Sequence, residues 1–85
     1  MTVQQLVAGI LARGHECQII INTEMVGLTR PNVRIWGTVR MKGPKDSSWR
    51  TAGTIAFNQI SIYSYEPLPG YDGTILENAM TEGGA

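Results

Sequence analysis

The stretch "GTIAFNQISIYSYEP", residues 53–67, contains two short runs in which apolar and polar residues alternate. Alternation with a period of two is typical of β-strands that are buried on one face. Only the polar pair Asn58 and Gln59 separates the runs, so we expect two neighbouring antiparallel strands. Their connection is either an ordinary hairpin or a sharp bend that closes a small barrel, and the fold depends on this choice.

The sequence before this stretch predicts one helix and further strands. Residues 2–14 carry apolar side chains at the i, i+3, i+4 and i+7 spacing of an amphipathic helix. Thr2 and Gln5 have the spacing of a capping box, and Gly14 suits the end of the helix. After Gly14 the period changes to two, and residues 23–32 are expected to connect the first two strands. The predicted strands cover residues 15–22, 32–43, 49–57 and 59–65.

Two glycines within the predicted strands indicate a strongly curved sheet. Gly37 and Gly53 both lie in the inward-facing phase of their strands. A glycine inside a strand is typical of a sharp bend or of a close approach by another backbone. The last long strand before the quoted turn is expected to place one set of residues on a single face: Trp49, Thr51, Gly53, Ile55 and Phe57. The sequence therefore predicts a mainly β fold with an N-terminal α-helix and a small, strongly bent antiparallel sheet.

The 85 residues are enough for one domain, which we expect to cover residues 1–67. Residues 68–85 are rich in Pro and Gly at their start and are expected to form an acidic, partly disordered tail. Residues 1–65 hold seven bases and three acids, a net charge of +4, whereas residues 66–85 hold four acids and no base. A core this small gains from self-association, and the single Cys17 excludes a disulfide within the chain.

The same residues give expectations about chemistry and location. No signal peptide or apolar run of membrane-spanning length is evident, which favours a cytoplasmic protein of a bacterial or phage-infected cell. His15 and Cys17 are two residues apart, but a catalytic dyad needs an orienting partner, so a buried inert thiol is the favoured interpretation. We expect no catalytic residues, metal, cofactor or small-molecule substrate.

The layout resembles the Sm-like (Lsm/Hfq-type) family, whose members have an N-terminal helix followed by a bent antiparallel sheet. "RTAGTIAF", "NQ" and "ISIYSYEP" are similar to the family's C-terminal signature, with Gly53 in its first strand. "WGTVRMKG" is similar to the family's glycine-bent strand. The resemblance covers about residues 2–67, and some phage-encoded members share this compact size. It implies a small Sm-like barrel that assembles into a homo-oligomeric ring of about five to seven subunits and binds single-stranded RNA.

Two groups of residues are the candidate sites. The resemblance places Asn58 and Gln59 in a loop that contacts a nucleotide, although plain turn chemistry is the alternative. One strand face carries basic groups and an indole that would bind phosphates and stack a base, with Arg50 expected nearby: Arg34, Trp36, Arg40 and Lys42. The alternative is that Trp36 is a contact surface and the bases are simply solvated.

The last strand is the predicted oligomer interface, because exposed strand edges pair readily and interfaces are enriched in tyrosine. Its residues are Ile60, Ile62, Tyr63 and Tyr65. A second hypothesis about function keeps the same small β fold. In it the chain is a non-enzymatic structural or protein-interaction module, for example in a phage particle, that binds no nucleic acid.

Overall fold

The computed structural model describes residues 1–27 and 32–83. It contains four strands between two helices, and the described part of the chain is mainly β, as the sequence predicts. In chain order the elements are α1 (Val3–Ala12), β1 (Glu16–Val26), β2 (Asn32–Lys42), β3 (Arg50–Phe57), β4 (Ile62–Pro67) and α2 (Tyr71–Gly83).

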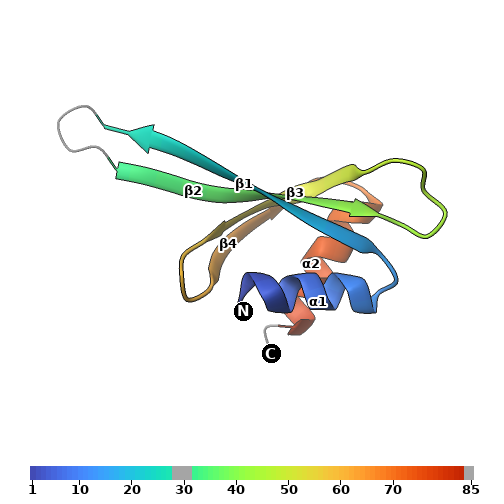
Figure 1. Cartoon of the computed structure of the whole chain (residues 1–85). Helices are drawn as coiled ribbons and strands as arrows, with labels where there is room; N and C mark the ends of the chain where they lie inside the picture. Colours follow the sequence, from blue (N-terminus) through green and yellow to red (C-terminus); the bar gives the residue numbers. More distant parts are fainter. Residues whose placement is uncertain (28–31, 84–85) are drawn as a thin grey trace.

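The four strands form one antiparallel sheet in the order β1-β2-β3-β4, and both helices lie against the same face of it (Figure 1). β1 and β4 are the two edges and do not pair with each other among the described residues. The sheet is therefore open, and the closed Sm-like barrel is not confirmed. The connection between β3 and β4 is a hairpin between neighbouring strands, which answers the question raised by the quoted stretch.

Helix α1 has the ends that its sequence predicts. The Thr2 hydroxyl accepts from the Gln5 N–H at 3.1 Å, and the Gln5 side chain accepts from the Thr2 N–H at 2.8 Å. These bonds satisfy N–H groups that have no partner within the helix. Gly14 follows the helix with φ of 84°, a conformation that favours glycine. Leu6 and Ile10 are fully buried against the sheet, so the predicted helix is confirmed.

The core forms where the helices cover the sheet. It combines residues of both helices with residues of β2, β3 and β4, all of them buried: Leu6, Ile10, Val39, Met41, Ala52, Ile55, Ile62, Ile75, Leu76 and Ala79. Three of these residues come from α2, within the segment that the sequence sets apart as a tail. A helix as short as α2 is marginal in isolation. Its buried residues pack in the shared core and hold it in place.

The register between β2 and β3 shifts by one residue, so one predicted face of β3 is wrong. Val39 lies opposite Gly53 whereas Arg40 lies opposite Thr51, which leaves Ala52 as the extra residue of a bulge. The bulge reverses the alternation before Gly53, so Thr51 lies on the same face as Arg40 instead of facing inward. Gly53 itself is required by close packing, because a Cβ there would be 2.3 Å from the carbonyl oxygen of Glu66.

The connection expected over residues 23–32 is shorter than predicted. β1 continues to Val26 and β2 begins at Asn32, so residues 23–26 and 32 of that segment are strand. β3 pairs with β2 only from Trp36 onward. The hairpin beyond this point, residues 23–26 and 32–35, extends past the rest of the sheet and is hereafter called the arm (Figure 1).

Candidate functional site

The exposed apolar residues of β1 and β2 lie at the arm and at its base. Cross-strand partners share a face of the sheet, so Cys17, Ile19 and Ile21 face the same way as Met41, Val39 and Gly37. Near the helices this face is the core, but toward the arm no described element covers it. Three of its described apolar side chains are exposed, Ile21, Met25 and Ile35, and we call them the apolar stripe.

The outer edge of β1 lies beside this stripe. β1 has eleven residues and contains neither proline nor glycine. Its only charged residues are Glu16 and Glu24, which leaves seven uncharged residues between them. In the sheet described here β1 has a neighbour on one side only, so its other side presents backbone N–H and C=O groups. Such an edge is a template on which another strand can pair.

The predicted nucleic-acid face is brought together only in part. Trp36, Arg40 and Lys42 alternate along β2 on the face away from the helices, and all three are half-buried. The Arg40 guanidinium donates to the carbonyl oxygen of Trp49 at 3.5 Å. Lys42 lies opposite Glu16 on β1, which reduces the local positive charge. Arg34 lies opposite Glu24 in the register, and its side chain falls outside the described part of the structure.

Arg50 does not join this face. It lies opposite Met41, whose side chain is in the core, and is therefore on the helix side of the sheet. Its guanidinium forms ion pairs of 2.9 Å with Asp46 and with Asp72 of α2. Two carboxylates already neutralise this cation, and the expectation that it lies beside Arg40 and Lys42 is wrong.

Asn58, a predicted nucleotide-contacting residue, stabilises the turn between β3 and β4. The Asn58 Oδ1 accepts from the N–H groups of Ile60 at 2.8 Å and Ser61 at 2.9 Å. This is the local turn chemistry to which asparagine is suited. Gln59 and Ile60 are exposed beside it, and Ile60 lies in the turn before β4 begins.

The predicted interface strand β4 is divided between core and surface. Ile62 is buried within its own chain, so it is a core residue rather than an interface residue. Tyr65 is half-buried, and Tyr63 is exposed. The Ile62 N–H donates to the carbonyl oxygen of Met1 at 2.7 Å, which covers the start of this strand.

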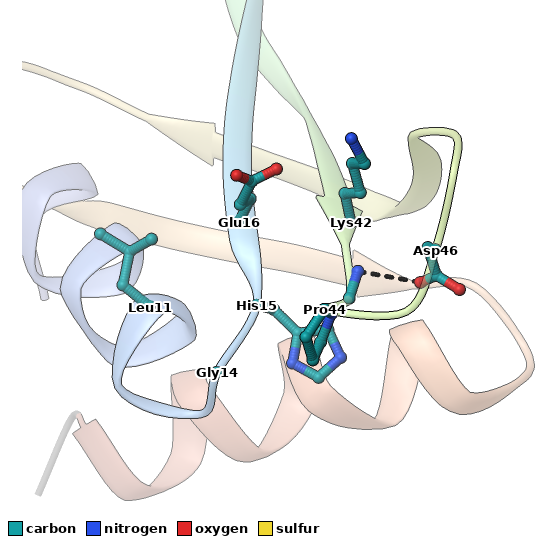
Figure 2. A pocket seen from close by; sticks show the side chains of 8 residues that line it. Leu11, Gly14, His15, Glu16, Lys42, Pro44 and Asp46 are labelled. Carbon is teal, nitrogen blue, oxygen red and sulfur yellow. Dashed lines mark hydrogen bonds between the residues drawn. The ribbon is translucent and has the colours of Figure 1, made fainter.

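A pocket of about 460 Å³ lies where α1 ends, beside the buried His15 (Figure 2). No pattern in the sequence indicated it. The His15 Nδ1 is 3.2 Å from the carbonyl oxygen of Arg13, and its ring centroid is 5.9 Å from that of Tyr71. Asp46 closes the neighbouring loop by accepting from the Gly43 N–H at 2.8 Å. The side chains of Glu16 and Lys42 point away from the imidazole (Figure 2), so no acid–base pair is assembled around it.

Cys17 is partly buried, and this burial raises the pKa of its thiol to about 11. A thiol with so high a pKa is mostly un-ionised at neutral pH and is a poor nucleophile. Within residues 1–27 and 32–83, three or more His, Cys, Asp or Glu side chains do not gather as a metal-ligand cluster. Neither of the described helices combines the length and hydrophobicity needed to cross a membrane.

Comparisons with protein families, with curated proteins and with solved structures found no match to this chain. The candidate site therefore rests on geometry. The apolar stripe and the adjoining edge of β1 form the candidate binding surface.

Proposed function

We propose that the chain is a non-enzymatic assembly module that binds protein through the edge of β1 and the apolar stripe. The observation that carries this proposal is that one strand supplies both: the eleven-residue edge strand β1 itself carries exposed Ile21 and Met25. The edge supplies backbone hydrogen-bonding groups, and the stripe supplies apolar area. Strand addition to a sheet edge combines these two contributions.

The energetics favour covering this part of the molecule. Burial of apolar surface contributes about 25 cal/mol per Å². Exposed apolar residues are ordinary when they are scattered, but here they follow one face of a hairpin that no described element covers. A small core also limits the stability of the isolated chain, so association contributes to folding as well as to function.

A ring-forming Sm-like protein that binds single-stranded RNA is the second candidate. The observation in its favour is that Trp36, Arg40 and Lys42 share one face of β2. Two observations weigh against it. Lys42 lies opposite an acid, and the amide oxygen of Asn58 is engaged in its own turn. We therefore rank the RNA-binding hypothesis below the hypothesis of an assembly module.

Sedimentation velocity of the wild-type chain and two matched variants tests the first candidate. Ile21 and Tyr63 are exposed by 61% and 66%, and each lies on an edge strand. Ile21→Glu is expected to weaken association by at least about 100-fold, because it puts a charge into the proposed interface. Tyr63→Glu, on the other edge, should leave the wild-type distribution unchanged. A wild-type chain that stays monomeric at all concentrations would refute the proposal.

RNA binding is measured separately, by fluorescence anisotropy with a labelled single strand at low and high salt. The assembly proposal expects no saturable binding. Binding that weakens with salt and falls in the Arg40→Gln and Lys42→Gln variants would instead support the second candidate.

A further inference from the structure

We infer that the partner is a second copy of this chain, and that the two β1 strands pair antiparallel about a two-fold axis at Ile21. The inference rests on the proposed function and specifies its partner and register. In the resulting dimer the two four-stranded sheets join edge to edge, with the helices of both copies on the same side.

The difference between the two sheet edges selects a two-fold dimer over a ring. A head-to-tail ring would require β1 of one copy to pair with β4 of the next. β4 has only six residues and ends in Pro67, which has no N–H to donate. The N–H of Ile62 at its start is already bonded to Met1. Pairing β1 with another β1 avoids this edge and satisfies both free strands at once.

Strand length and charge together select the register. A two-fold axis perpendicular to the sheet lies between one residue of β1 and the same residue of the second copy. Ile21 is the midpoint of Glu16–Val26. Only this centre pairs all eleven residues. An axis one residue earlier, at Ile20, would place Glu16 opposite Glu24 of the second copy, twice in each dimer. With the axis at Ile21, Glu24 instead lies opposite the uncharged Gln18.

The same register gives cross-strand partners to Ile21 and Met25, the two stripe residues on β1. Alternation keeps each face of the two sheets continuous, so apolar residues meet apolar or small ones. On the helix-side face, Ile21 meets Ile21, Ile19 meets Thr23, and Met25 meets Cys17. Met25 of each copy thereby approaches the end of β1 where exposed Leu11 and Glu16 border the pocket of Figure 2.

Cysteine cross-linking under mild oxidation tests the register in the full-length chain. In a Cys17→Ala background, single variants Ile19→Cys, Ile21→Cys and Thr23→Cys are compared at equal concentration and oxidation time. Only the residue on the axis meets its own copy, while the other two lie about 13 Å from theirs along the strands. A disulfide requires Cα atoms within about 7 Å. We expect at least about tenfold more linked dimer from Ile21→Cys.

Two further samples check the pairing independently. Mixing Ile19→Cys with Thr23→Cys, both in that background, should give linked heterodimer that neither gives alone. Met25→Cys in a chain that keeps its natural Cys17 should link through Cys17, and the link should disappear when Cys17→Ala is added. A short bismaleimide repeats each comparison without the geometric demands of a disulfide.

The outcomes separate this inference from the proposed function. Three outcomes would overturn the pairing of two β1 strands about Ile21 but leave assembly through the β1 edge and the apolar stripe standing. They are preferred linkage through Ile19→Cys, equal linkage at all three positions, and no linkage in an oligomer that Ile21→Glu still disrupts. A wild-type chain that is monomeric by sedimentation would overturn both. A discrete ring of five or more subunits would overturn the two-fold dimer alone.

Discussion

The two edges of the sheet are built differently. β4 is short, ends in Pro67, and is covered at its start by the carbonyl group of Met1. β1 is almost twice as long, contains no proline, and continues into an arm with an exposed apolar face. Natural sheets protect the edges that must not pair, by means such as short length and proline. This contrast underlies our proposal that β4 is closed to pairing and that β1 is open to a partner.

A molecule with a single open edge forms closed pairs. If both edges were open, each added copy would expose a new edge, and the array would grow or close into a ring. The protected β4 removes that possibility.

The largest effect is expected where β4 is held against β3. A Cβ at Gly53 would lie 2.3 Å from the Glu66 carbonyl oxygen and 2.9 Å from the Pro67 Cα. Because backbone atoms give way poorly, Gly53→Ala should lower the free energy of unfolding by about 3 kcal/mol. Gly14→Ala is the control, since open space surrounds Gly14 and only its positive φ opposes a side chain. It should cost about 1 kcal/mol. Urea denaturation measures both, and equal losses would contradict the close packing of β4.

The arm and the β3–β4 turn each carry a highly exposed apolar residue. Met25 in the arm is exposed by 69% and Ile60 in the turn by 80%. Met25→Ser should weaken self-association about tenfold, close to 1.4 kcal/mol, because it removes apolar contact area from the proposed interface. Ile60→Ser should leave association unchanged. Sedimentation equilibrium measures both constants, and a larger effect from Ile60→Ser would place the interface at the wrong edge.

The Cys17 thiol provides a test of burial at the base of β1. Burial raises the pKa of Cys17 to about 11, above the ordinary pKa of a thiol. The unfolded chain therefore loses this proton at lower pH than the folded chain, and stability is unaffected at neutral pH but falls as the pH rises toward 11. The expected loss between pH 8 and 10 is about 1.5 kcal/mol. Denaturation across this range, with Cys17→Ala as the control, measures it. An identical pH dependence in both chains would show that Cys17 is not desolvated.

The smallest effect concerns the charge pattern along the β1 edge. In the proposed register Gln18 lies opposite Glu24 of the second copy. Gln18→Glu should weaken the dimer a few-fold, and Gln18→Lys should strengthen it by a similar factor, since a cross-strand charge pair contributes about 0.2–1 kcal/mol. Both effects should shrink in high salt. Equal effects of the two substitutions would argue against this register.

Much of the fold follows from local patterns. The stripe of apolar residues and the capping box predict α1, and alternation predicts four strands near their observed positions. Periodicity could not reveal the bulge at Ala52, because one extra residue reverses every face before it. The length of β1 was missed because residues 27–32 carry turn-forming residue types. α2 is marginal alone, and its packing depends on contacts distant in sequence.

The candidate site was harder to predict for a physical reason. Ile19 and Ile21 belong to the same alternating pattern, yet Ile19 packs against the core whereas Ile21 is exposed. The sequence marks the apolar face of a strand but not where the covering helices end. The basic residues of β2 were identifiable, whereas the acids opposite them depend on the strand register.

The native mass of the purified wild-type chain, measured across a range of concentrations by native mass spectrometry and sedimentation equilibrium, shows how many copies associate. We expect a reversible monomer–dimer equilibrium with no larger species. Cross-linking through Ile21→Cys should trap that dimer. A chain that is monomeric throughout would contradict an open edge at β1. A ring of five to seven subunits at all concentrations would contradict a closed edge at β4.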